Sequence, residues 1–178
     1  MSMSILSRGF TLIELMIGIV VLAIAITLAA PSFESVIANN RSITLSNDLV
    51  MTLLLARSEA VKRGVSVSVC AAGNQNLNSC GTDWKQGWII FVNPDENTTF
   101  ANNTTEILIR TQSNSIQSLT ISSVPTNSGI ITFTSTGFVN SSTRDMQLNV
   151  SVTGCTGNHG RTLSLSPTGR PQLTPFSC

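Results

Sequence analysis

The chain opens with an almost uninterrupted apolar segment and then changes its pattern twice. Residues 10–30 are apolar except for a few small polar residues and one acidic residue, Glu14, and no basic residue follows until well beyond them. In the next thirty residues the apolar positions recur at the spacing of one helix face, as Leu45, Leu49, Leu53, Ala56 and Ala60. From Val65 onward the apolar positions alternate instead, which is typical of strands. We therefore predict one long helix over residues 10–63 followed by a β domain over residues 64–178.

The apolar segment is long enough to cross a lipid bilayer. A helix over residues 10–30 would extend about 30 Å, which is roughly the thickness of the hydrocarbon core. Arg8 precedes it and the next basic residue is Arg41, so the charge bias favours a cytoplasmic start and an exported body. Pro31 predicts a bend rather than an end, and Gly64 predicts the end of the helix. The first half of the helix is thus expected to span a membrane.

The body is predicted to be antiparallel. The segment 65–69 alternates Val and Ser, which favours a strand with one apolar and one polar face. Further strands are expected where similar runs are separated by Gly, Pro, Asn and Ser, at residues 87–92, 106–110, 118–121, 130–134, 146–152, 161–166 and 172–176. The fold class is therefore α+β, with a long N-terminal helix packed on a small antiparallel β-sheet domain.

The composition excludes some classes of function but does not identify one. Only 11% of the 178 residues are charged and the formal net charge is +1. Ser, Thr and Asn are abundant around residues 93–105 and 125–128, and long polar loops of this kind suit an extracellular surface. The sequence has no glycine-rich phosphate loop and no convincing nucleophile near His159. We therefore expect neither an enzyme nor a cofactor.

Four cysteines in an exported domain predict disulfides. Cys70, Cys80, Cys155 and Cys178 allow three pairings, among which the sequence alone does not choose. We favour Cys70 with Cys80, which closes a loop, and Cys155 with Cys178, which ties the chain end to the domain. Metal binding is the competing interpretation, because Cys155 and His159 are four residues apart. Two ligands do not make a structural zinc site, so no metal is expected.

Glu14 needs an explanation, because an acidic side chain inside a membrane helix costs a few kcal/mol. The residues from Thr11 to Glu14 fit a capping box, in which the carboxylate accepts hydrogen bonds from free amide groups at the helix start.

The segment RGFTLIEL at residues 8–15 resembles the type III signal of type IV pilins and pseudopilins. This resemblance implies a leader over residues 1–9, which the prepilin peptidase removes between Gly9 and Phe10, and N-methylation of Phe10. It also implies that Glu14 pairs with the methylated amine of a neighbouring subunit. Two opposite charges are tolerated in hydrocarbon when they meet, and this role and the capping box are compatible at different stages. The apolar segment then stays on the mature protein, unlike that of a secretory signal peptide.

Three later segments extend the resemblance over most of the chain. They read ARSEAVKRG at residues 56–64, WIIFVN at 88–93 and PTGR at 167–170, and they are similar to motifs of the FimT, FimU and GspH group of minor pilins and pseudopilins. The group implies a long helix that carries a β domain, and a role in initiating or capping a type IV pilus. A minor pseudopilin of a type II secretion system is the alternative.

The implied partners are other pilins or pseudopilins, the prepilin peptidase, the inner-membrane assembly platform and membrane lipid. The implied location is the bacterial inner membrane, with a single span and a periplasmic body, and then a filament whose tip reaches the cell surface. Some FimT-like pilins bind DNA through a Gly-Arg-x-Arg motif. Here the matching stretch is Gly169-Arg170-Pro171-Gln172, which lacks the second arginine. Arg161 and Arg170 remain as candidates for weak, salt-sensitive phosphate contacts.

Overall fold

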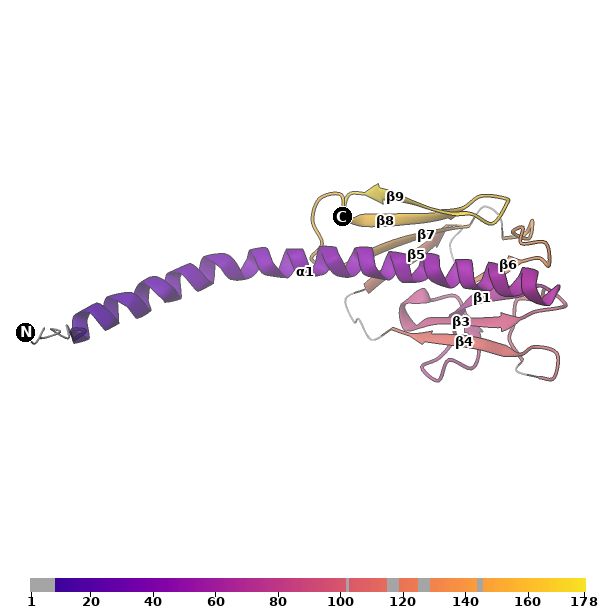
Figure 1. The fold of residues 1–178 in the computed structure, drawn as a ribbon, viewed down its shortest axis with the longest axis horizontal. Coiled ribbons are helices and arrows are strands. Elements are labelled where there is room, and N and C mark those ends of the chain that lie inside the picture. Colours follow the sequence, from indigo (N-terminus) through magenta and orange to yellow (C-terminus); the bar gives the residue numbers. More distant parts are fainter. Residues whose placement is uncertain (1–8, 102, 115–118, 125–128, 144–145) are drawn as a thin grey trace, which may run out of the picture.

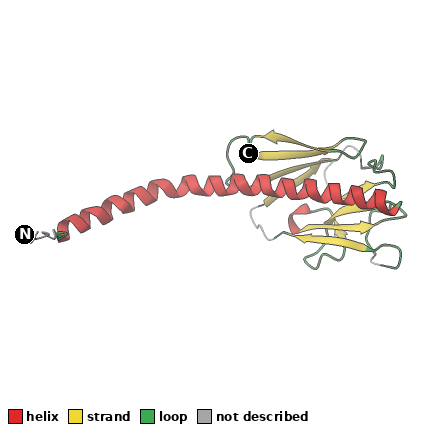
Figure 2. Cartoon of the chain, in the orientation of Figure 1, coloured by secondary structure: helices red, strands yellow, loops and turns green. Residues whose placement is uncertain are grey.

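The computed structural model describes residues 9–101, 103–114, 119–124, 129–143 and 146–178, without the side chains of residues 28–32. The leader residues 1–8 and the polar segment 125–128 lie outside the described residues. The chain forms one long helix, of which the C-terminal half lies along a body of two β-sheets (Figure 1). The N-terminal part of the helix extends away from the body (Figure 2).

Helix α1 (Leu12–Arg63) has the two ends that the sequence predicts. Thr11 is its N-cap, and Gly64 ends it in the left-handed conformation at φ 66°, donating its N–H to the carbonyl of Ala60 at 3.0 Å. The helix continues through Pro31 as expected, and its N-terminal half curves gently (Figure 1). A proline within a helix removes one backbone hydrogen bond and leaves the remaining turns intact.

The predicted apolar stripe of α1 is confirmed. Its five members are buried against the body, and they share one core cluster with residues of both sheets. None of the five is more than 7% exposed: Leu45, Leu49, Leu53, Ala56 and Ala60. The stripe also continues toward the N-terminus through Ser42 and Ala38, which the spacing of large apolar residues did not predict. Ser42 is fully buried, and its Oγ is satisfied there because it accepts a hydrogen bond from Val152 N at 2.9 Å.

The first sheet contains β1 (Val67–Ala72), β2 (Cys80–Gly81), β3 (Gly87–Val92), β4 (Leu108–Ser113) and β6 (Ile130–Phe133). Its central strand is β1, with β3 and then β4 on one side and β2 and β6 on the other, and all pairs are antiparallel. Strand β3 has the predicted bounds. Strand β2 and the short helix η1 (Trp84–Gln86) were not predicted, because two or three residues are too few to produce a periodic pattern.

The second sheet contains β5 (Leu119–Val124), β7 (Gln147–Val152), β8 (Gly160–Leu165) and β9 (Pro171–Phe176), paired antiparallel in that order. The antiparallel α+β class is therefore confirmed, and the body divides into two sheets rather than one. Both sheets pack on α1, the second sheet along one flank of the helix and the first along the other (Figure 1).

The prediction of a polar face on the opening strand was wrong. Every residue of β1 is buried, including Ser68 at 0% exposed. The Ser68 hydroxyl forms hydrogen bonds with Thr132 Oγ1 and Asn93 Nδ2, each at 2.8 Å, so it is satisfied inside the protein. A second, smaller core of Cys70, Ala72, Ile89, Phe91 and Phe100 covers the face of this sheet away from α1. The polar loop around residues 93–105 therefore packs through Phe100.

The strand predicted at residues 106–110 begins later, at Leu108. Glu106 precedes it, buried at 2% exposed, and its carboxylate accepts hydrogen bonds from Ala101 N at 2.5 Å and from Asn97 Nδ2 at 2.9 Å. The side chain of Asn103 accepts the backbone N–H of Glu106 at 2.8 Å. These local bonds compete with strand pairing and hold Glu106 in the loop.

Candidate assembly interface

The start of α1 presents the predicted processing and assembly residues. Phe10 is 81% exposed, and apart from the two chain neighbours of Gly9 no atom of the described residues lies within 4 Å of where a side chain at Gly9 would begin. Thr11 Oγ1 accepts a hydrogen bond from Glu14 N at 3.3 Å, which is one arm of the predicted capping box. Within the described residues, the Glu14 carboxylate has no hydrogen bond or ion pair. The carboxylate is thus free for a group outside the described part of the chain.

The first turns of α1 carry apolar side chains on every face. Between Leu12 and Ile26 the large apolar side chains are 56–76% exposed, and the body contacts none of this segment (Figure 2). Over the described residues, no helix combines the length and the apolar composition that a membrane crossing requires. Each large apolar side chain gains about 1.5–3 kcal/mol when it is fully buried. The segment therefore favours contact with an apolar surface that this chain does not itself supply.

The last turns of α1 form a joint with two loops of the body. Arg57 Nε donates to the carbonyl of Gly137 at 3.0 Å. Gly169, from the turn between β8 and β9, lies so close that an added Cβ would be 2.4 Å from the same carbonyl. Both glycines have a positive φ, at 81° for Gly137 and 77° for Gly169, which favours glycine. The motif residues Arg57 and Gly169 thus connect the helix to both sheets.

Glu59 lies near the end of α1, with its side chain 15% exposed. Its carboxylate contacts Arg63 Nε at 2.6 Å and Lys62 Nζ at 3.9 Å. The hydrogen bond from Arg63 holds the pKa of the Glu59 carboxyl below its usual value. The two cations also stand near the negative end of the helix, where positive charge is favourable. The contacts of Glu59 with Arg63 and Lys62 therefore stabilise the end of the helix.

The two arginines proposed for DNA contacts are not brought together. Arg161 is at the start of β8 opposite Pro175, whereas Arg170 follows the turn at the far end of the same hairpin. Four residues of strand separate Arg161 from that turn, or about 13 Å. Arg161 Nη1 also donates to the carbonyls of Asn158 and Gly160 at 2.8 and 2.9 Å. The geometry therefore provides no shared phosphate site for this pair.

Both disulfides of the favoured pairing are present. Cys70 and Cys80 are bonded across the loop between β1 and β2, and Cys155 is bonded to Cys178 at the chain end. Cys155 is consequently not a thiolate ligand, and His159 Nδ1 contacts the carbonyl of Thr156 at 2.5 Å. Among the described residues, no group of three or more His, Cys, Asp or Glu side chains is arranged to hold a metal ion.

Comparison with known families and structures covers nearly the whole chain. The model of the family described as type II transport protein GspH matches residues 45–169, and that of the prokaryotic N-terminal methylation motif matches residues 5–30. Two crystal forms of the type IV minor pilin FimU from Pseudomonas aeruginosa are similar in structure, each at 26% identity. Their TM-scores are 0.58 and 0.55, covering 76% and 74% of this chain and 90% and 91% of FimU. No curated protein sequence matches the chain.

Proposed function

The chain belongs to the type II transport protein GspH family and is a type IV minor pilin or pseudopilin, and from that premise we propose that it initiates or caps a type IV pilus. The observation that carries the proposal is the division of α1. Its residues from Leu12 to Ile26 are apolar on all sides and exposed, whereas its stripe from Leu45 to Ala60 is already buried against the body. One helix thus offers an assembly segment and a carrier segment. Pilins and pseudopilins are structural subunits, which matches this arrangement.

Processing would create a new N-terminus at the start of the assembly segment. In this proposal the prepilin peptidase cuts between Gly9 and Phe10, and the new amine of Phe10 is methylated. The match of residues 5–30 to the methylation motif supports this step. The exposure of Phe10 and the open surroundings of Gly9 are also compatible with access by a peptidase.

Glu14 would then set the position of the subunit. Its carboxylate pairs with the methylated amine of a neighbouring subunit, so neither charge is left unpaired within an apolar bundle. The lack of a partner for Glu14 within the described residues supports this role, as does the capping of its amide by Thr11. The side chain of Glu14 is therefore not needed to cap its own helix.

Before assembly, the segment 10–30 would hold the subunit in the bacterial inner membrane, with the body in the periplasm. There it meets membrane lipid, the prepilin peptidase and the inner-membrane assembly platform. After assembly it would contact other minor and major pilins, and a position at the tip would expose the body at the cell surface. The two disulfides support export to an oxidising compartment.

A minor pseudopilin of a type II secretion system is the second candidate. The description of the matched family as a type II transport protein favours it, whereas the similarity to the minor pilin FimU over 90% of that chain favours the pilus. The two roles predict different defects when the gene is deleted. Loss of surface pili supports the pilus, and loss of protein secretion with normal pili supports the pseudopilus.

DNA capture can be tested directly. Because Arg161 and Arg170 lie at opposite ends of a hairpin, we expect the double substitution of both to Ala to leave DNA retention by the full-length chain unchanged at physiological salt. Retention would be measured by filter binding of labelled duplex DNA over a salt series. A substantial loss of retention together with a shallower salt dependence would restore the DNA role.

The assembly role of Glu14 is tested with a Glu14→Ala variant in a strain that lacks the native gene. We expect normal amounts of the chain in membranes and at least a several-fold loss from sheared pili, because the charge that meets the neighbouring amine is gone. Glu59→Ala is the matched control, since it removes an acidic side chain from the other end of the same helix. Wild-type levels of Glu14→Ala in pili would contradict the proposed pairing.

A further inference from the structure

The loop between β3 and β4 contains the sequence DENTT at residues 95–99. An asparagine two residues before Ser or Thr is the acceptor pattern for an N-linked glycan in the surface loops of exported proteins. Six asparagines of the chain fit this pattern, and among them only Asn97 also has an acidic residue two positions before it. Which of the six can accept a glycan in the folded chain depends on the geometry around each amide group.

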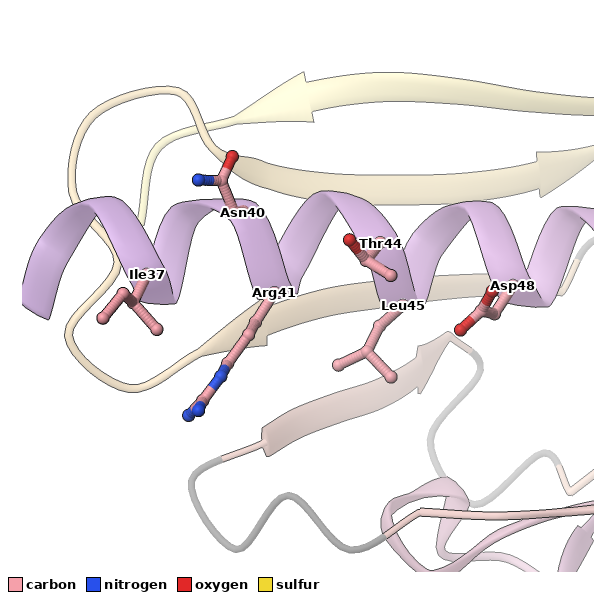
Figure 3. A pocket seen from close by; sticks show the side chains of 6 residues that line it. All are labelled: Ile37, Asn40, Arg41, Thr44, Leu45 and Asp48. Carbon is pink, nitrogen blue, oxygen red and sulfur yellow. The ribbon is translucent and has the colours of Figure 1, made fainter.

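Regular secondary structure excludes two of the six. Asn40 lies on α1 (Figure 3) and Asn149 lies on β7, so helix and sheet hydrogen bonds hold both backbones in place. A transferase has to reach around the acceptor segment, which a surface loop permits and a helix or paired strand does not. Asn102 lies outside the described residues. Three candidates in loops remain: Asn97, Asn103 and Asn140.

The amide group of Asn97 contacts two carboxylates. Its Nδ2 donates to Asp95 Oδ2 at 2.8 Å and to Glu106 Oε1 at 2.9 Å. Asp95 is exposed, whereas Glu106 is 2% exposed, so one contact lies toward solvent and the other toward the interior. An asparagine amide nitrogen carries two hydrogens. One of them can therefore be replaced on the solvent side while the other keeps the bond to Glu106.

The threonine of the motif lies beside the same amide group. Asn97 Oδ1 accepts a hydrogen bond from Thr99 N at 3.1 Å, and the Thr99 hydroxyl is 3.5 Å from that oxygen. Thr98 and Thr99 are both exposed. The hydroxyl that defines the acceptor pattern is thus next to the amide group and accessible from solvent.

The other two candidates lack part of this arrangement. Nδ2 of Asn103 has no hydrogen bond within the described residues, and Nδ2 of Asn140 contacts one carboxylate, that of Glu96. An amide nitrogen is a poor nucleophile because its lone pair is delocalised into the carbonyl group. Carboxylates that accept its N–H groups raise the electron density on the nitrogen and are placed to remove a proton. This chemistry favours Asn97, which contacts two carboxylates.

We propose that Asn97 accepts an N-linked glycan from a lipid-diphosphate glycan donor after the body is exported. In the transfer, a bond forms between Nδ2 and C1 of the first sugar while the bond between C1 and the diphosphate oxygen breaks. The electron pair leaves with the lipid diphosphate, and the proton from Nδ2 passes to Asp95 and then to water. The remaining N–H keeps its bond to Glu106. The inference rests on the export contained in the proposed function and is independent of the pilus role.

The position of the loop is compatible with a bulky group. The loop lies at the end of the body near the C-terminus of α1, away from the exposed apolar segment (Figure 1). Phe100, just after the motif, is 7% exposed and packs against Phe91 with the ring centroids 4.8 Å apart. The loop is thus anchored, and a glycan on Asn97 would cover polar surface without obstructing contacts of the apolar segment.

Mass spectrometry of the chain purified from the native organism tests the site. Trypsin releases residues 86–110 as one peptide, because no Lys or Arg lies between Lys85 and Arg110. Electron-transfer fragmentation of that peptide then assigns a glycan to one asparagine. We expect a sugar mass on Asn97 in the wild type and none in Asn97→Gln. Asn103→Gln is the matched control, because it removes an acceptor pattern from the same loop and should leave the occupancy of Asn97 unchanged.

Two further substitutions test the motif while they keep Asn97. Thr99→Ala removes the hydroxyl and should lower the occupancy of Asn97 at least tenfold, whereas Thr99→Ser should retain it. Asp95→Asn removes the carboxylate on the solvent side and should lower the occupancy at least several-fold. The two disulfides, measured in the same spectra, report that each variant is exported and folded.

An unmodified Asn97 in chains that carry both disulfides would overturn the inference, because such chains have been exported and folded. A glycan confined to Asn103 or Asn140 would overturn the choice of Asn97. Unchanged occupancy in Asp95→Asn would contradict the part that Asp95 has in the transfer. Glycosylated chains that never enter pili would support this inference and reject the pilus role.

Discussion

The two halves of α1 are both rich in apolar residues, and their fates differ because of how those residues are distributed. From Leu12 to Ile26 the apolar side chains surround the helix and stay exposed, while from Ala38 to Ala60 one stripe of them is buried and others, such as Met51, remain exposed. A stripe can be covered by a single body, whereas a fully apolar helix needs an apolar environment on all sides. The comparison teaches that periodicity, more than hydrophobicity, separates a segment that folds onto its own chain from one that needs partners.

The largest expected effect compares one leucine from each half. Leu53→Ala opens a cavity in the core and should lower the free energy of unfolding by about 2–5 kcal/mol. Leu22→Ala removes the same atoms from a side chain that is 59% exposed, and it should change stability by no more than about 0.5 kcal/mol. Urea denaturation of the full chain in detergent, followed by the fluorescence of Trp84 and Trp88, measures both. Equal losses of unfolding free energy in the two variants would mean that the two halves of α1 do not differ in how they are packed.

The joint at the end of the docked half provides the next test. Gly169→Ala places a methyl group 2.4 Å from the Gly137 carbonyl at a positive φ, so we expect a loss beyond the roughly 1–2 kcal/mol that a left-handed alanine costs. Gly157→Ala is the control, because its φ is 63° but its Cβ would meet nothing closer than 3.8 Å. The difference between the two melting temperatures isolates the close contact with Arg57 and Gly137. A Gly169→Ala variant no less stable than the control would argue against the joint.

A smaller effect is expected from one hydrogen bond of the docked half. Trp88 Nε1 donates to Thr52 Oγ1 at 2.9 Å, and Thr52→Val would leave this buried donor unpaired at a cost of about 1–3 kcal/mol. Among the described residues, the side chain of Thr27 in the exposed half bonds only to the carbonyl of Ile24, so Thr27→Val should be nearly neutral. Thermal unfolding monitored by near-UV circular dichroism would compare them. If both variants unfold at the same temperature, the bond to Trp88 does not stabilise the docking.

The smallest effect concerns pH. The pKa of Glu59 is lowered in the folded chain by the Arg63 hydrogen bond, so its contribution is present above the unfolded value of 4.5 and is lost as the pH falls through the folded value. Glu59→Gln should therefore be slightly less stable than the wild type at pH 7 and equal to it in strong acid. Because Arg63 is 39% exposed and solvent screens the pair, the difference at pH 7 is expected to be small. A difference in stability that grows toward low pH would contradict the direction of the Glu59 pKa shift.

Much of the fold follows from local pattern. The ends of α1 are predicted by Thr11 and Gly64, and its buried stripe by the spacing of Leu45 to Ala60. The features that were missed depend on contacts between distant segments. Ser68 alternates like a surface residue, but Thr132 and Asn93 satisfy it in the interior, and the division into two sheets depends on long-range pairing.

The candidate site was predictable to a similar degree. Gly9, Phe10 and Glu14 are identified by a short, specific motif near the start of the chain, and the structure places all three at the exposed end of α1. The separation of Arg161 from Arg170 could not be predicted, because it depends on the register of β8 and β9.

Mass spectrometry of sheared surface pili from the native organism tests the central claim most directly. If the exposed apolar half of α1 serves a pilus, the preparation contains this chain at low abundance, beginning at N-methylated Phe10. A chain that is processed at Phe10 but confined to the membrane would contradict the pilus role and favour the secretion pseudopilus. A mature chain that still carries residues 1–9 would contradict the proposed cleavage between Gly9 and Phe10.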